Sequence, residues 1–110
     1  MENSEHMQEL QFLEQNLNSI LMQKRALDME VAELESSLEE IKKTDEDVFK
    51  LIGNIMIKTD KKSVEEDLKE KIERTKSKEK AYEAQEKNVS KRIGEIREKA
   101  LKAKKEEKKE

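Results

Sequence analysis

At 110 residues, with 46% charged and only 33% apolar, the chain has little apolar volume for an ordinary globular core. Its 24 basic and 27 acidic residues leave a net charge of only −3, which argues against the disorder that a large net charge produces. Proline and cysteine are both absent. Long helices are therefore favoured, and disulfides and thiolate chemistry are excluded.

Membrane and targeting signals are missing from the sequence. No run approaches the roughly 18 apolar residues of a membrane span. The N-terminal segment lacks the basic and apolar blocks of a secretory signal. We therefore expect a cytoplasmic protein that makes no membrane contact.

The first predicted element is a helix over residues 6–44, preceded by a frayed end. Apolar residues recur along it at alternating spacings of three and four, with Lys24 as the one polar interruption. The apolar members of this ladder are Leu10, Leu13, Leu17, Ile20, Leu27, Val31, Leu34, Leu38 and Ile41. So long a heptad ladder predicts one strand of a coiled coil.

Five further apolar residues of this helix lie off the ladder: Met7, Phe12, Leu21, Met22 and Met29. Scattered apolar side chains are normal on protein surfaces, so they need no function. Most of them, however, lie toward the end of the helix that is remote from the next element. Methionine suits adaptable surfaces, so a binding role is the alternative.

A β-hairpin is predicted over residues 48–58, the only β-rich stretch of the chain. Gly53 and Asn54 form a two-residue loop of the kind that tight hairpins use. The loop predicts that Ile52 faces Ile55 and that Leu51 faces Met56. A helix that continues through this segment is the alternative, although a Gly-Asn pair among β-branched residues breaks helices well.

This hairpin is expected to need partners. A lone two-stranded hairpin is marginal in water, and its free edges would template further strand pairing. Apolar side chains would lie on both of its faces. Strands of several subunits, closed into a barrel or stacked as sheets, would remove both problems. The sequence therefore predicts an obligate oligomer.

The second predicted helix covers residues 63–105 and is followed by a charged tail over residues 106–110. Ser63 and Glu66 match a capping box at its start. Its heptad positions are Leu68, Ile72, Thr75, Glu79, Tyr82, Glu86, Val89, Ile93, Ile96, Ala100 and Ala103. Glutamates interrupt the lysines of the tail and no aromatic residues accompany them, so we expect no nucleic-acid binding.

The charged residues that flank each heptad ladder predict that the two helices pair with each other. Those of the first helix are mostly acidic and those of the second mostly basic. The favoured register sets Leu38 opposite Leu68. Its flanking pairs would be Glu35 with Lys69, Asp28 with Lys76, Glu30 with Lys78 and Glu9 with Lys99. Lys24 would lie between the layers of Glu79 and Glu86, mainly as a register lock; a flexible middle of the shaft is the alternative.

No catalytic constellation appears. His6 is the only histidine, and the two glycines, Gly53 and Gly94, form no phosphate-binding loop. We expect no enzyme activity, no cofactor and no metal site.

A leucine-rich helix, an apolar hairpin and a charged helix in this order resemble the β-type subunit of prefoldin, in particular the archaeal type. The segment from Val48 to Lys58 carries most of the resemblance, with Phe49 where tyrosine is common. The implied fold is mainly α: one domain over residues 1–110, a long antiparallel coiled-coil helical hairpin with one short β-hairpin between the helices. The α-type subunits carry two hairpins, for which this chain has no room.

The resemblance implies a hexamer of two α-type and four β-type subunits, which holds unfolded client proteins without ATP and delivers them to a group II chaperonin. The implied oligomerisation residues are Val48, Phe49, Leu51, Ile52, Gly53, Asn54, Ile55, Met56 and Ile57. The implied client-binding tips are Met7, Leu10, Phe12, Leu13, Ile93, Ile96 and Leu101. The competing hypothesis is a structural coiled-coil adaptor or scaffold with one defined partner.

Overall fold

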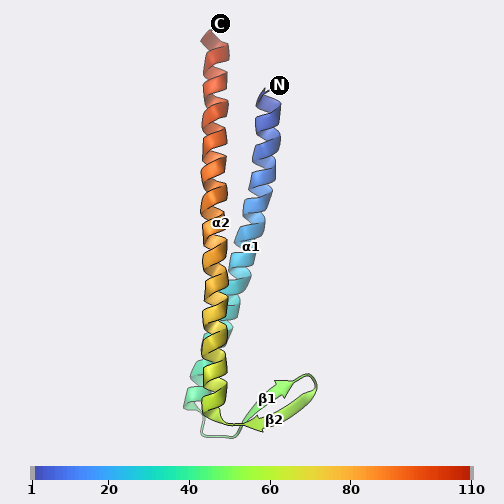
Figure 1. Cartoon of the computed structure of the whole chain (residues 1–110), viewed down its shortest axis with the longest axis vertical. Helices are drawn as coiled ribbons and strands as arrows, with labels where there is room; N and C mark the ends of the chain where they lie inside the picture. The colour runs from blue at the N-terminus through green and yellow to red at the C-terminus, as the bar shows by residue number, and fades with distance from the viewer. Residues whose placement is uncertain (1, 110) are drawn as a thin grey trace. The chain divides into compact units, whose positions relative to one another are not determined.

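The protein, described here by a computed structural model over residues 2–109, consists of two long helices with one hairpin between them (Figure 1). The elements are α1 (Glu2–Lys43), β1 (Val48–Ile52), β2 (Ile55–Thr59) and α2 (Lys61–Lys109). This confirms the predicted fold class. The outermost positions of the expected domain, Met1 and Glu110, lie outside the described residues.

Packing divides the chain into two compact units that share both helices. The first unit combines the described residues up to Arg25 with those from Lys80 onward, and the second is Ala26–Glu79. In the first unit the N-terminal and C-terminal ends of the chain lie at the same end, so its helical segments run antiparallel (Figure 1). The second unit contains the hairpin and the helix ends that flank it.

Burial follows the predicted heptad ladders. Every ladder position from Leu10 to Ile41 and from Leu68 to Ala103 is buried or partly buried. The most buried are Ile20, Ile72, Thr75, Ile93 and Ile96. The Thr75 hydroxyl donates a hydrogen bond to the backbone carbonyl of Lys71 at 2.8 Å, which satisfies the one buried polar residue among the described residues. The heptad period therefore identified the seam of each unit correctly.

The helix α1 begins at Glu2, although the sequence predicted fraying before residue 6. Residues 2–6 contain neither glycine nor proline, and an acidic side chain such as Glu5 near a helix start interacts favourably with the helix dipole. At the other end, α1 ends at Lys43, one residue before the predicted end, and the Thr44 amide still donates to the Glu40 carbonyl at 3.0 Å.

The start of α2 differs from the predicted capping box at Ser63. The helix begins at Lys61, and the carboxylate Oδ1 of Asp60 accepts a hydrogen bond from the Ser63 amide at 2.6 Å. Asp60 is therefore the N-cap, and Ser63 is the third residue of the helix. An aspartate caps as well as a serine and adds a negative charge at the positive end of the helix dipole, which explains why it prevails.

The end of α2 also differs from the predicted boundary. The helix continues to Lys109 instead of ending near residue 105. Residues 102–109 contain only alanine, lysine and glutamate, which are all strong helix formers. The segment expected to be a separate tail is thus the last turn of the helix, apart from Glu110, which lies outside the described residues.

The hairpin has the predicted register. Ile52 pairs with Ile55 and Leu51 with Met56, and the antiparallel pairing continues to Val48 and Thr59. Gly53 has a φ of 61°, whereas Asn54 has none of the positive values seen in left-handed backbone. Glycine at the first loop position is the hallmark of a type II′ turn, whose twist matches that of the strands. The continuous helix considered above is thus excluded.

Candidate functional site

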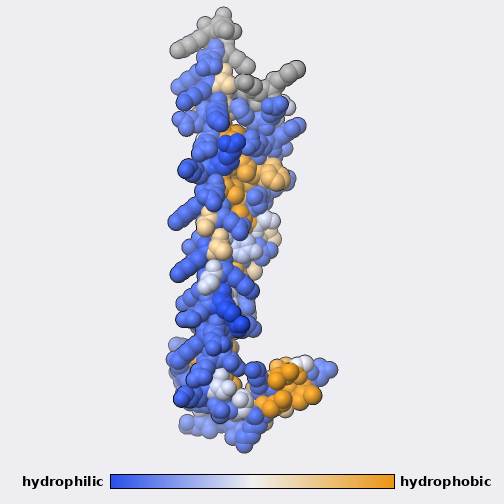
Figure 2. Space-filling model, in the orientation of Figure 1, coloured by the Kyte–Doolittle hydropathy of each residue, from blue (hydrophilic) through white to orange (hydrophobic). Residues whose placement is uncertain are grey.

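The hairpin exposes an unusual amount of apolar surface. Six large apolar side chains of its ten strand residues are exposed: Phe49, Leu51, Ile52, Ile55, Met56 and Ile57, with exposed fractions between 47% and 68%. Figure 2 shows this surface as a concentration of orange over the hairpin. So large an apolar patch on so small an element is typical of an interface between proteins.

Both faces of the hairpin contribute to this surface. Strand pairing places Ile52, Ile55 and Ile57 on one face, and Leu51 with Met56 on the other. A two-stranded sheet also has two free edges, whose unpaired backbone groups can bond to further strands. The hairpin can therefore join neighbouring strands at its edges and cover apolar side chains at its faces.

Polar contacts tie the hairpin to the helix that follows it. The Lys50 ammonium lies 3.0 Å from the Asp67 carboxylate of α2. The Lys58 ammonium lies 3.5 Å from Asp47, which belongs to the connection between α1 and β1. All four side chains are exposed. Such pairs contribute little stability, so they orient the hairpin more than they hold it.

A second connection joins the ends of the two helices beside the hairpin. The Lys61 ammonium donates hydrogen bonds to the carbonyls of Lys42 at 2.8 Å and Thr44 at 3.1 Å. A cation at the C-terminal end of α1 is favourable, because that end carries unpaired carbonyls and a negative partial charge. Sequence reasoning missed this contact. Its only signal was a lysine at the start of α2, where a positive charge is otherwise unfavourable.

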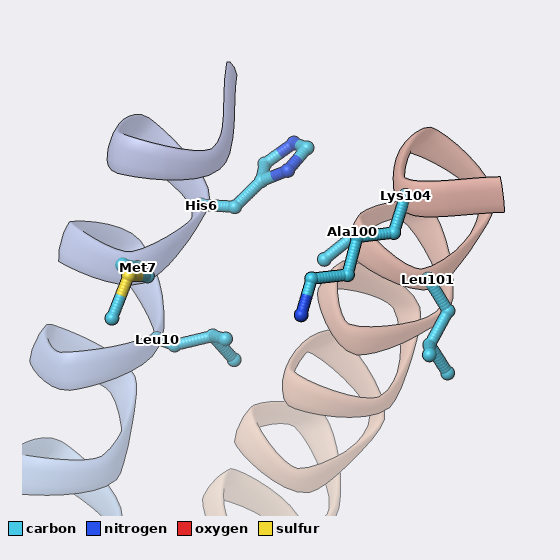
Figure 3. A pocket seen from close by; sticks show the side chains of 6 residues that line it. All are labelled: His6, Met7, Leu10, Ala100, Leu101 and Lys104. Atoms are coloured by element: carbon cyan, nitrogen blue, oxygen red, sulfur yellow. The ribbon is translucent and has the colours of Figure 1, made fainter. Parts of the chain in front are cut away.

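In the first unit, an open cleft lies between the N-terminal part of α1 and the C-terminal part of α2. Its volume is about 350 Å³, and its lining comprises His6, Met7, Leu10, Ala100, Leu101 and Lys104. Figure 3 shows that His6 and Leu10 point toward α2, while Lys104 reaches toward α1. The cleft is mainly apolar, with polar groups near its outer end. Met7 and Leu101 are exposed by 63% and 62%, so both are available to a partner.

The seven predicted client-binding residues fall into two groups. Met7, Phe12 and Leu101 are exposed. Leu10, Leu13, Ile93 and Ile96 lie in the seam, where Ile93 is 6% and Ile96 only 1% exposed. The first group can meet a client without separation of the helices, as can Leu10 where it lines the open cleft, whereas the buried Ile93 and Ile96 cannot. The binding role of both groups stays a prediction.

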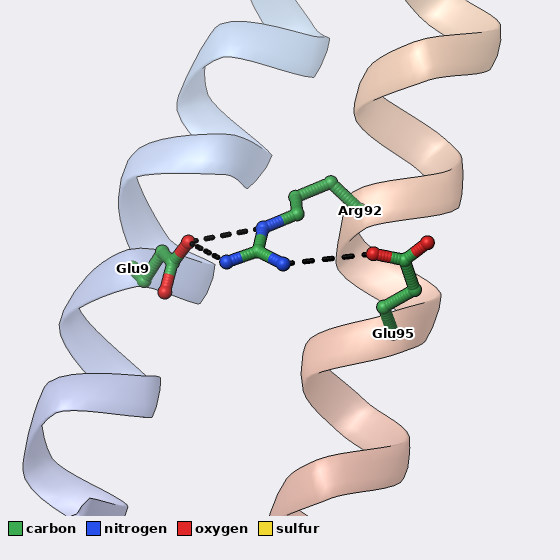
Figure 4. Close-up of polar contacts among 3 residues, drawn as sticks. All are labelled: Glu9, Arg92 and Glu95. Atoms are coloured by element: carbon green, nitrogen blue, oxygen red, sulfur yellow. Dashed lines mark hydrogen bonds and ion pairs between the residues drawn. The ribbon is translucent and has the colours of Figure 1, made fainter.

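An ion-pair network near this end links the two helices. Arg92 donates to Oε1 of Glu9 from Nε at 3.2 Å and from Nη2 at 3.0 Å, while its Nη1 lies 3.5 Å from Glu95 (Figure 4). The hydrogen bonds to Glu9, followed by the charge of Glu9 and then by Glu95, raise the pKa of Arg92 above its ordinary value. Both carboxylates thus favour the charged form of Arg92, which arginine keeps at physiological pH even without such partners.

The partners of the flanking charges differ from those predicted. Glu9 pairs with Arg92 instead of Lys99, because the forked guanidinium can offer two donors to one carboxylate. Glu35 pairs with Lys76 at 3.4 Å instead of Lys69. Side chains lean toward the N-terminus of their own helix, so in the predicted register Glu35 and Lys76 lean together while Glu35 and Lys69 lean apart.

The remaining flanking charges complete this correction. Glu14 pairs with Arg97 at 2.9 Å, a contact that had not been predicted. Because Lys76 is taken by Glu35, the predicted pair of Asp28 with Lys76 does not form. Glu30 and Lys78 form no ion pair in the described part of the chain. Opposite charge on the two helices was thus predicted correctly, whereas the individual partners were not.

Lys24 forms the ion pair that the middle of the seam suggested. Its ammonium lies 2.7 Å from Oε2 of Glu86, and the two side chains are 24% and 30% exposed. Both residues occupy heptad positions that apolar residues fill elsewhere. A charged pair at such positions disfavours registers in which either charge would face an apolar layer. The contact supports the interpretation of Lys24 as a register lock.

We expect Lys24→Glu to destabilise the helical pair by about 1–3 kcal/mol, because it sets two carboxylates against each other in a partly buried layer. Urea unfolding followed by helical circular dichroism measures this loss. Adding Glu86→Lys should restore part of it, whereas Lys80→Glu, on an exposed position of α2, should cost far less. Strictly additive effects of Lys24→Glu and Glu86→Lys would show that the two residues are not coupled.

Comparisons with known proteins agree with this architecture. A model of the family described as "Prefoldin subunit" matches residues 4–108. The chain belongs to the prefoldin subunit family, a family of chaperone subunits. It is 34% identical over 93 residues to the prefoldin subunit beta of Thermococcus onnurineus, and the match covers 83% of this chain and 80% of that protein. It is 32% identical to the subunit of the same name in Thermococcus kodakarensis, over 80% of this chain and 77% of that protein.

A solved structure supports the same family. The crystal structure of the prefoldin beta subunit from Thermococcus strain KS-1 matches with a TM-score of 0.88 and 29% identity, over 92% of this chain and 90% of that one. The resemblance to β-type prefoldin is thereby confirmed, and it extends beyond the hairpin to most of the chain. Within residues 2–109 of this chain, neither α1 nor α2 contains an apolar stretch able to span a membrane.

Proposed function

We propose that this chain is a β-type subunit of an ATP-independent holdase chaperone. It assembles through its hairpin with α-type prefoldin subunits, in a hexamer of two α-type and four β-type chains. The free ends of its helical pair bind unfolded proteins, which the complex passes to a group II chaperonin. Membership of the prefoldin family and the apolar hairpin support this proposal.

The exposure of the hairpin is the observation on which assembly rests most. Six large apolar side chains of the hairpin stay exposed in the described chain. They would lower the solubility of an isolated subunit. Because 47–68% of each side chain is exposed, covering the rest is worth roughly 1 kcal/mol per side chain, and the six together favour strand pairing with other subunits. The hairpin is therefore the assembly surface, and the helices are free for another task.

Client binding is proposed for the cleft and the exposed residues around it. An unfolded protein offers short apolar segments without a fixed shape. Met7 and Leu101 line an open, apolar cleft that can accept such segments without any ligand-specific geometry. Several weak contacts, one from each subunit of a complex, can combine into strong binding through avidity. A cytoplasmic location and delivery to a chaperonin complete the proposal and rest on the family.

Suppression of aggregation by the assembled complex tests this function. The complex of this chain with an α-type subunit should prevent several unrelated, chemically denatured proteins from aggregating on dilution, and it should do so without ATP. A structural adaptor would bind one folded partner and leave such proteins to aggregate. Failure to protect any unfolded protein would reject the holdase proposal, and retention of one specific folded partner would favour the adaptor.

A further inference from the structure

One stretch of α1 in the first unit is almost free of charge. Of the 17 residues 7–23 only Glu9 and Glu14 are charged, whereas seven of the 17 residues 80–96 in α2 are. Both glutamates are paired with arginines of α2. The surface that α1 turns to solvent here is therefore neutral, in a chain of which 46% is charged.

A row of side-chain amides runs along this neutral surface. Gln8, Gln11, Gln15 and Asn18 follow one another at spacings of three, four and three, so they share one face of the helix, and all four are exposed. Beside or in line with them, Phe12 and Met22 are 68% and 69% exposed. We call these six residues the amide face.

The chemistry of the amide face fits an unfolded polypeptide. Each carboxamide offers both a donor and an acceptor, as does each peptide group of a bound chain. An apolar side chain that docks on Phe12 or Met22 brings its own backbone groups out of water, and these then need partners. Charged side chains would instead hold water at the surface and raise the cost of desolvation.

The dimensions of the face suit an extended segment. Met22 lies ten positions after Phe12, so the two residues are about 15 Å apart along the helix axis. An extended chain spans this distance in about five residues. A helix of a second copy would fit less well, because helix pairing needs an apolar stripe at spacings of three and four, and here amides occupy those positions.

We propose that the amide face is a second client-binding surface, which takes an extended, uncharged segment of an unfolded protein in addition to the segment held in the cleft. This inference rests on the proposed holdase function and deepens it, because it names the kind of segment that is bound. It also places binding on the side of α1, outside the seam. Of the seven predicted tip residues, only Phe12 belongs to this face.

The test adds charge to the face without change of shape. The pair Gln15→Glu and Asn18→Asp alters the amide face, and the matched pair Gln85→Glu and Asn88→Asp makes the same chemical change at exposed positions of α2. Each pair is assembled with α-type subunits. Binding is then measured to denatured, reduced lysozyme, which is basic, and to denatured, reduced α-lactalbumin, which is acidic.

We expect the α1 pair to weaken binding of both probes by about fivefold or more, because carboxylates on a buried face must lose water without gaining partners. The α2 pair should change binding less than about twofold, as exposed charges do. Native mass and helical circular dichroism should match the unmodified complex for both pairs.

Three results would overturn the inference and leave the holdase proposal standing. Equal effects of the two pairs would remove any special role of α1. Weakening of the acidic probe alone would point to general repulsion. Loss of assembly by the α1 pair only would mean that another subunit covers this face. An unmodified complex that binds neither probe would overturn the inference together with the proposed function.

Discussion

Replacing Ile55 and Ile57 with aspartate should abolish assembly while the helices remain folded. Both side chains lie on one face of the hairpin and are 65% and 47% exposed, so the subunit itself loses few contacts. In a complex, the charges would face apolar strands of neighbouring subunits without a partner. The penalty of about 3 kcal/mol or more corresponds to at least a hundredfold weaker association.

Sedimentation or light scattering would measure this effect, with circular dichroism as the test of folding. The control introduces the same two negative charges on α1 through Ser36→Asp and Ser37→Asp, at exposed positions outside the hairpin. It should assemble normally. A full-size complex from the hairpin variant would show that subunits associate elsewhere.

The combined substitution of Met7 and Leu101 with serine should leave assembly intact and weaken client binding by about tenfold or more. These side chains line the cleft and are exposed, so their truncation does not open the seam. Burial of a methionine or leucine against a client is worth about 1.5–3 kcal/mol, and the loss repeats in every copy of the subunit.

Substitution is a cleaner test than deletion of residues 1–13. Such a deletion would remove the part of α1 that covers Ile93 and Ile96. Both are almost fully buried, so the deletion would expose new apolar surface. Met29→Ser provides the control, because Met29 is 66% exposed but lies in the second unit. Equal protection of denatured proteins by the double variant and by the unmodified complex would rule out the cleft as a client site.

The features predicted correctly from the sequence are those that a repeat or a short loop dictates. Heptad spacing identified every seam position, because only one face of each helix can be covered by the other. The Gly53–Asn54 loop fixed the strand register, since a two-residue turn leaves no freedom in which residues face each other. The apolar character of the hairpin followed from the apolar residues on both sides of this loop.

The features predicted less well depend on competition between neighbouring groups. Asp60 and Ser63 can both cap a helix, and a small difference in free energy decides between them. The partners of Glu9 and Glu35 depend on the lean and reach of side chains, which residue spacing alone does not contain. The contact of Lys61 with the carbonyls of α1 depends on the path of the chain around the hairpin.

Native mass spectrometry of this chain mixed with an α-type prefoldin subunit tests the central claim most directly. The claim is that the chain is a β-type subunit whose exposed hairpin completes an assembly with a different chain. We predict one dominant species with the mass of two α-type chains and four copies of this chain. Two separate masses that never combine, at subunit concentrations where each chain is folded, would contradict the account.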